Sequence, residues 1–286
     1  MLARLGLRAL GAGALLAVVA AAAAHADESP FAAIYTTEIL PARGAEIEQW
    51  LTYENGRPFE SWDHVEGRTE YEYGITNRFQ LAGYLNYDYF HILPKTAQAG
   101  DDAANHFDLT SGSLEAIYRI ADPVTHRVGV ALYLEPAYGP DSREIEAKIL
   151  LDTHFLDDRL TIAANGVLEY EWQRSGSGAP FERATELVLL TGASYRFAPG
   201  LYGGLEFEAK REGDGALFSD AFHPAADSFR IGPTLHYAKG NWWVTASWLA
   251  QLPVAATLNG DPDEVTDGFA HEVPRHALRL RFGIEL

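Results

Sequence analysis

Charged side chains recur at every second position in many stretches of the 286-residue sequence, as at Glu46 and Glu48 or at Arg279 and Arg281. Because successive side chains of a β-strand point to opposite faces, this spacing gathers the charges on one face of a sheet. We expect that face to line the inside of a barrel as a polar, mostly acidic wall. The predicted lumen or binding residues are Glu46, Glu48, Arg68, Glu70, Glu72, Glu115, Arg119, Glu144, Glu146, Lys148, Glu169, Glu171, Glu206, Glu208, Arg230, Arg279 and Arg281.

Two interpretations of this charged face remain open. Opposite charges on neighbouring strands stabilise a sheet, so the acids and bases could pair and fill a narrow lumen. Alternatively, the wall surrounds a water-filled path for solutes. Eight strands give a filled interior and sixteen or more an open channel, and the twelve strands expected here fall between these cases. An open lumen with more acids than bases is expected to prefer cations.

Catalytic chemistry finds little support. A lipid hydrolase would need a serine and a histidine close together at the outer rim of the barrel. His154 and His236 fall on the charged face, and the other candidates lie in predicted loops: His91, His106, His223 and His271. No serine motif joins any of these histidines into a dyad, so we expect a protein without enzymatic activity.

Cofactor and metal chemistry is not expected either. The chain has no cysteine, which removes thiol nucleophiles and disulfides. The acidic stretch with Asp261, Asp263, Glu264 and Asp267 offers oxygen ligands for Ca²⁺, but no glycine follows at the turn position of a calcium-binding loop. We interpret these acids as solvated loop charge.

The elements that position the charged face are strands. Residues 65–89, VEGRTEYEYGITNRFQLAGYLNYDY, hold two alternating segments around a turn at residues 76–78. The same pattern recurs from Ala45 to the chain end at Leu286 and predicts twelve strands, joined in turn by short turns and longer loops. An even strand number with this asymmetry is typical of an outer-membrane barrel. The sequence therefore predicts an all-β fold, a single antiparallel up-and-down transmembrane β-barrel at residues 44–286.

Aromatic residues favour lipid over a soluble core around this barrel. On the apolar face they cluster at the strand ends, with Tyr73 and Trp242 next to short turns and Tyr53 and Tyr89 next to loops, while aliphatic residues lie between them. Aromatic rings are most stable at the two interfaces of a bilayer, so this arrangement predicts two girdles around a hydrocarbon-facing band.

The N-terminus indicates export. Arg4 and Arg8 precede an apolar run that closes on Ala24-His25-Ala26, so residues 1–26 are predicted to be a secretory signal peptide. Residues 27–43 are expected to form a short periplasmic lead that stops at Pro41. The sequence carries a net charge of −18, which argues against nucleic acid as a partner.

Four segments carry a resemblance to a known group: AEIEQWLTYE, EYGITNRFQLAGYL, LYLEPAYGPDSREIEAKILL and GPTLHYAKGNWWVTASWLAQL. They resemble an uncharacterised family of proteobacterial outer-membrane barrels, similar in build to the "MetA-pathway of phenol degradation" proteins. The resemblance implies the outer membrane of a Gram-negative bacterium and small, often aromatic, solutes. It also implies contact with outer-membrane lipid and with the barrel-insertion machinery through the last strand, although barrels of this kind usually end in Phe or Trp rather than Leu286.

The sequence as a whole favours a narrow channel or transporter for small solutes, including hydrophobic or aromatic ones. A closed barrel with a structural or surface-interaction role is the alternative, and an outer-membrane lipid hydrolase is a third. Neither the solute nor the role of the long loops at 92–106, 212–226 and 253–274 follows from these patterns.

Overall fold

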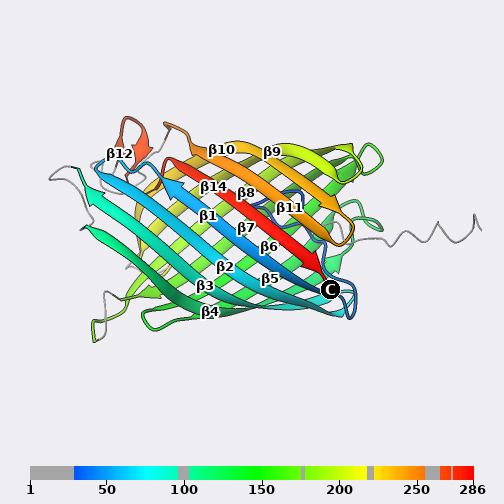
Figure 1. The fold of residues 1–286 in the computed structure, drawn as a ribbon, viewed down its shortest axis with the longest axis horizontal. Coiled ribbons are helices and arrows are strands. Elements are labelled where there is room, and N and C mark those ends of the chain that lie inside the picture. The colour runs from blue at the N-terminus through cyan, green and yellow to red at the C-terminus, as the bar shows by residue number, and fades with distance from the viewer. Residues whose placement is uncertain (1–28, 96–102, 175–177, 218–221, 255–264, 272) are drawn as a thin grey trace, which may run out of the picture.

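The computed structural model describes residues 29–95, 103–174, 178–217, 222–254, 265–271 and 273–286, and these residues form a closed antiparallel barrel (Figure 1). A short hairpin lies beside it. The barrel strands are β1 (Ala45–Asn55), β2 (Glu60–Thr76), β3 (Phe79–Pro94), β4 (Ala104–Ala121), β5 (Gly129–Tyr138), β6 (Ser142–Phe155), β7 (Leu160–Gln173), β8 (Glu182–Ala198), β9 (Leu201–Asp214), β10 (His223–Lys239), β11 (Trp242–Gln251) and β14 (His276–Glu285), and the hairpin strands are β12 (Val265–Thr266) and β13 (Phe269–Ala270).

Each barrel strand pairs with its neighbour in sequence, and β14 pairs with β1 to close the ring. The prediction of a twelve-stranded all-β barrel is therefore confirmed. Several strands extend further than their alternation suggested: β2 begins at Glu60 rather than Val65, and β4 at Ala104 rather than Ser113. The β2 extension carries polar Ser61 and Asp63 on its outer face, so it lacks the apolar–polar alternation of the rest of the strand.

The connections differ at the two ends of the barrel. At one end, here called the turn end, most links are tight, as at Pro199-Gly200, where Gly200 has a φ of 69° that favours glycine, and residues 122–128 form a longer one. The first residue of β1 and the last of β14 lie at this end. The opposite end, the loop end, holds the longer connections and the β12–β13 hairpin (Figure 1).

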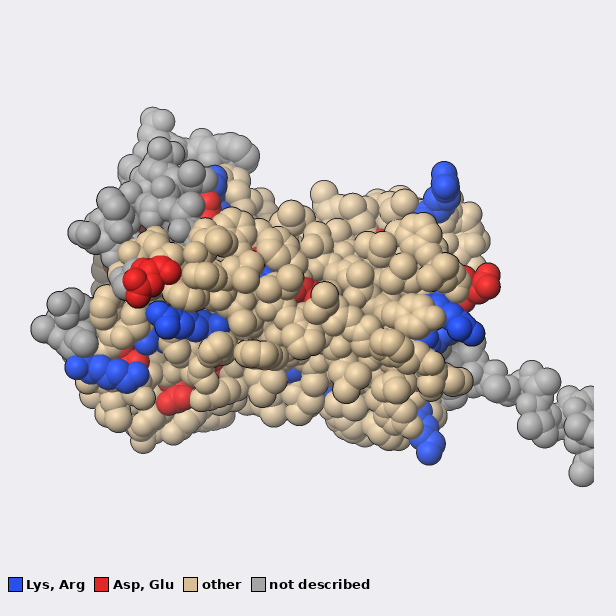
Figure 2. Space-filling view, turned by 90° about the horizontal axis from the view of Figure 1, so that it is seen from above, with Lys and Arg blue, Asp and Glu red and all other residues tan. Residues whose placement is uncertain are grey.

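The outer face of the barrel is apolar. Ile47 on β1, Leu132 on β5 and Leu280 on β14 are 46%, 47% and 43% exposed. In Figure 2 the charged residues appear mostly near the two ends of the molecule, and the surface between them is formed by other residues. Tyr53 and Trp242, at opposite ends of the barrel, are also exposed, in agreement with the predicted girdles.

No helix in the described part of the chain is long and apolar enough to cross a membrane.

The inner face of the barrel is polar and largely buried. Glu48 and Glu70 are almost inaccessible to solvent, as are Arg281 and His236. Apolar side chains outside and charged ones inside reverse the burial pattern of a soluble protein, and this reversal is characteristic of transmembrane barrels.

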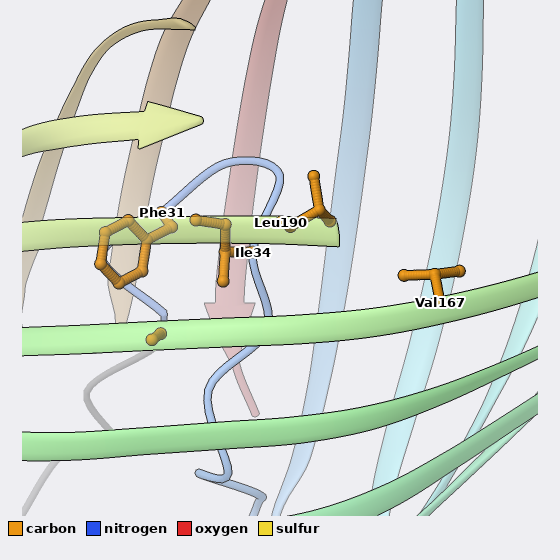
Figure 3. Packing of buried hydrophobic residues seen from close by; sticks show 5 residues of the cluster. Phe31, Ile34, Val167 and Leu190 are labelled. Atoms are coloured by element: carbon orange, nitrogen blue, oxygen red, sulfur yellow. The ribbon is translucent and has the colours of Figure 1, made fainter. Parts of the chain in front are cut away.

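The N-terminal segment, residues 29–43, corrects one expectation. The sequence suggested a periplasmic lead at residues 27–43, but the described part of it lies inside the barrel, where Phe31 and Ile34 are fully buried. They pack against Ala163 and Leu190 on the inner wall, and Figure 3 shows them inside the ring of strands. The predicted signal peptide, residues 1–26, lies outside the described residues.

Two glycines make room for this segment. A Cβ atom at Gly192 on β8 would come within 2.6 Å of Ile34 and 2.8 Å of Phe31, and one at Gly74 on β2 would come within 2.1 Å of the Pro41 carbonyl. The segment enters beside Gly74, where the Arg43 amide donates to the Gly74 carbonyl at 2.7 Å. It therefore reaches the lumen from the turn end.

The opposite polarity of the two faces leads to a stability prediction. Leu132→Arg places a charge on the outer face and should cost about 2–4 kcal/mol in a folding titration in lipid vesicles. Ala137→Arg, on the same strand, is the matched control because Ala137 faces the acidic inner wall opposite Glu144. Equal losses for the two variants would contradict the assigned inner and outer faces.

Candidate functional site

A cavity of about 980 Å³ occupies the loop-end half of the lumen, and we call it the vestibule. Ala33 and Tyr35 of the N-terminal segment contribute to its lining, so the segment forms its floor. Twelve carboxylates and six Lys or Arg side chains line it together with His64 and His106. The acids are Glu54, Glu66, Asp88, Asp108, Glu135, Asp141, Glu144, Glu146, Glu169, Glu171, Glu186 and Glu208, and the bases are Arg68, Lys148, Arg174, Lys210, Arg230 and Arg279.

A row of glutamates crosses the vestibule wall from β5 to β9. The strand register places them directly opposite one another in the order Glu135, Glu146, Glu169, Glu186 and Glu212. Like charges at opposed positions destabilise a sheet unless other charges compensate for them. We call this row the acidic ladder.

Three bases neutralise part of the acidic ladder. Arg68 pairs with Glu135 at 2.5 Å, Lys148 with Glu146 at 2.8 Å, and Lys210 with Glu186 at 2.5 Å. These pairs sit at both sides of the ladder, and its central member, Glu169, is not part of them.

The centre of this wall keeps an excess of negative charge. Glu171 lies two residues from Glu169 on β7, and the register places it opposite Glu144 on β6. Within the described residues, none of these three carboxylates forms an ion pair with Lys or Arg. Carboxylates facing a cavity between low-dielectric walls attract cations more strongly than they would in open water.

Except for Glu66, the acids of the opposite wall have basic partners among the described residues. Arg230 bridges Glu208 at 2.6 Å and Glu54 at 3.1 Å. His64 lies 3.5 Å from Glu54 and 3.6 Å from Asp88, and its ring stacks on Phe90 with centroids 4.2 Å apart. The negative field of the vestibule is therefore concentrated on the β6–β8 side.

The backbone of the N-terminal segment is held by polar side chains of the inner wall. The Glu206 carboxylate accepts hydrogen bonds from the Ala32 and Ala33 amides at 2.8 and 2.9 Å. Asn165 accepts from the Tyr35 amide and donates to the Tyr35 carbonyl, both at 2.8 Å, as a neighbouring strand would. These contacts satisfy buried backbone groups that would otherwise be costly.

Side chains of the N-terminal segment also contact the inner wall. The Tyr35 ring packs edge-on against Tyr133 at 5.2 Å, and the Lys148 ammonium lies over both rings at 4.4 and 4.1 Å. The Thr37 hydroxyl donates to Asp152 at 2.5 Å. These contacts pack the N-terminal segment against the inner wall on the turn-end side of the vestibule.

The structure assigns the predicted lumen residues to four places. Nine line the vestibule: Arg68, Glu144, Glu146, Lys148, Glu169, Glu171, Glu208, Arg230 and Arg279. Six lie deeper, toward the turn end: Glu46, Glu48, Glu70, Glu72, Glu115 and Arg281. Glu206 holds the N-terminal segment. Arg119 is on the inward face, opposite Ala131, and lies at the turn-end rim, where it donates to the Asn77 carbonyl and pairs with Asp122.

Other site residues escaped sequence analysis. Glu135 is followed by Pro136, which interrupts the strand pattern, and His64 directly precedes the alternating segment that begins at Val65. Asn165 and Asp152 were on the charged face, but their role depends on the N-terminal segment. The histidines considered for a hydrolase lie apart: His154 contacts Asp152, His236 contacts Thr245, and His106 contacts Asp108.

Solved structures with a similar fold come from outer-membrane proteins. The COG4313 outer membrane channel from Pseudomonas putida F1 has a TM-score of 0.60 and 10% identity over 87% of this chain and 98% of that chain. The beta domain of the Bordetella autotransporter BrkA gives 0.54 and 12% over 86% and 100%, and the NanC porin 0.50 and 10% over 84% and 100%. At such low identity these likenesses establish the fold, an outer-membrane type of β-barrel like those of channels and porins.

No curated protein matches the sequence. Residues 23–286, nearly the whole chain, match the model of a family whose function is not known. The chain belongs to this family, DUF6662.

Proposed function

We propose that the protein is an outer-membrane channel of a Gram-negative bacterium that admits small solutes from the loop end and prefers cations. The vestibule carries this proposal, because its central wall presents Glu144, Glu169 and Glu171 without a basic partner among the described residues. We propose insertion through the last strand, β14, which Leu286 follows, and no enzymatic role.

The solute class follows from the chemistry of the vestibule. The Trp50, Tyr35 and Phe90 rings line it together with the carboxylates, and this combination suits small organic cations that carry an apolar or aromatic part. The resemblance to the phenol-degradation group supports small aromatic solutes in the same way. The N-terminal segment would then be the constriction that a solute must pass.

The sign of the reversal potential tests this proposal. Purified protein in a planar bilayer, measured across a KCl gradient, should give a conductance whose reversal potential indicates K⁺ over Cl⁻, because the twelve carboxylates of the vestibule outnumber its six Lys and Arg side chains. Raising the salt at a fixed gradient should weaken the preference, since screening shortens to roughly 3 Å at 1 M. A preference for Cl⁻ would contradict the proposal.

A closed structural barrel is the second candidate. The observation that favours it is the fastening of the N-terminal segment by Glu206, Asn165 and Asp152. It predicts no conductance from the whole protein.

A further inference from the structure

A second acidic group lies deeper in the lumen, toward the turn end of β1 to β4, and the vestibule does not include it. Its five carboxylates are almost fully buried. The strand register opposes them in pairs across β1 and β2, and Ala82 on β3 separates Glu72 from the fifth on β4. The group, here called the deep carboxylates, consists of Glu46 opposite Glu72, Glu48 opposite Glu70, and Glu115.

Several of the deep carboxylates accept hydrogen bonds. The Trp243 indole donates to Glu46, and the Tyr84 hydroxyl donates to Glu115. Further donors supply the others: Trp50 to Glu48 at 2.7 Å, Arg281 to Glu48 at 3.0 Å, and Gln80 to Glu72 at 2.9 Å.

Glu70 is the exception. It is 1% exposed, and neither of its oxygens accepts a hydrogen bond within the described residues. Tyr84 lies opposite it on β3 but donates to Glu115 instead, and Oε1 of Glu115 has no donor either. A buried carboxylate without donors costs several kcal/mol, so this arrangement calls for a ligand that carries positive charge.

The geometry of the deep carboxylates suits a metal ion. One oxygen each from Glu70, Glu72 and Glu115 lie within 4.8 Å of one another, and so do oxygens from Glu46, Glu48 and Glu72. All of these ligands are hard carboxylate oxygens, with no His or Cys among them, which selects for Ca²⁺ or Mg²⁺ over transition metals. A cage of several protein carboxylates favours Ca²⁺, because Mg²⁺ usually retains waters and one or two carboxylates.

We propose that Glu70, Glu72 and Glu115 bind a Ca²⁺ ion, with Glu46 and Glu48 beside it. Two side chains connect this site to the N-terminal segment. The Gln80 amide donates to Glu72 while its oxygen accepts from the Leu40 amide at 2.7 Å, and Arg281 contacts both Glu48 and the Phe31 carbonyl. The ion therefore strengthens the wall on which the segment rests and stabilises the closed lumen.

Calcium binding to the full-length mature barrel, refolded in detergent and stripped with a chelator, tests this proposal. We expect saturable binding of one Ca²⁺ per chain by calorimetry. The midpoint of thermal unfolding should rise by about 5 °C or more once Ca²⁺ reaches 100 times its dissociation constant. Tb³⁺ should replace Ca²⁺ and luminesce on excitation of Trp50 and Tyr84, which contact the ligands.

Variants test whether Ca²⁺ binds at the deep carboxylates rather than in the vestibule, and whether an ion rather than shared protons neutralises them. Glu70→Gln, or Glu115→Gln if the first does not fold, should weaken binding at least about tenfold, and Glu171→Gln in the vestibule should leave it unchanged. Loss of binding in Glu171→Gln with retention in Glu70→Gln would overturn the assignment. The assignment would also be overturned if the wild type shows no saturable Ca²⁺ binding and Glu70→Gln is more stable than the wild type. Protons shared among the carboxylates would then neutralise the group.

Discussion

Deletion of residues 29–40 is expected to raise the single-channel conductance several-fold. The segment fills the turn-end half of the lumen, where Phe31, Ile34 and Tyr35 pack against wall residues that would otherwise face water. Its backbone is bound through side chains rather than through strand pairing, so its removal leaves the hydrogen bonds of the barrel intact. Conductance in planar bilayers at one salt concentration measures the effect.

Two less drastic changes act on the same segment. Asn165→Ala removes two hydrogen bonds to Tyr35, each contributing about 1 kcal/mol, and should increase the frequency of opening. Asn86→Ala is the matched control, because Asn86 lines the vestibule and bonds to Ser111 and Ser113 instead.

A covalent lock provides the converse test. The chain has no cysteine of its own, so Thr37→Cys with Asp152→Cys can be joined by a short thiol-reactive cross-linker. We expect the cross-linked protein to remain at its lowest conductance. If deletion, Asn165→Ala and the cross-link all leave the conductance unchanged, the N-terminal segment does not obstruct the path.

The sequence predicts the barrel well because period-two alternation is a local property. Ala131 and Leu132 illustrate this point: the pattern places them on opposite faces, and the structure buries Ala131 completely while exposing Leu132. It could not predict what Ala131 contacts. Ala131 packs in an apolar cluster with Tyr35 and Ile39 of the N-terminal segment, so an inward position here is not a position in water.

The N-terminal segment itself carries no alternation, and its hydrogen-bond partners on the barrel are 31 to 250 residues away along the chain. A sequence signal did exist on the wall. Ile117, Leu150 and Val167 are large apolar residues on the face that otherwise carries charge, and they contact the segment or its surroundings. Apolar residues facing a lumen indicate that something apolar fills it.

The charged residues were predictable as a set, but their division into sites was not. Period two identifies Glu70 and Glu169 equally as inward-facing. Only the register shows that Glu70 faces Glu48 in a buried group while Glu169 lies in the middle of the acidic ladder. Register depends on pairings between strands, which a single strand's pattern does not contain.

Reversal of the three unpaired carboxylates at the centre of the vestibule wall should change the ion preference of the proposed channel. Glu144→Lys, Glu169→Lys and Glu171→Lys together replace the negative centre of the wall with a positive one, so the reversal potential should shift toward Cl⁻. The shift should be largest in dilute salt, because the Debye length is about 30 Å at 0.01 M and about 10 Å at 0.1 M.

The control for this triple variant changes charge without changing the vestibule. Glu182→Lys with Asp214→Lys lies at exposed positions near the loop end of β8 and β9, outside the residues that line the cavity. We expect a small shift or none, because exposed charges are screened by the surrounding salt. An equal shift in both variants would mean that net charge at the mouth sets the preference. An unmoved reversal potential in the triple variant would mean that permeating ions do not pass the β6–β8 wall.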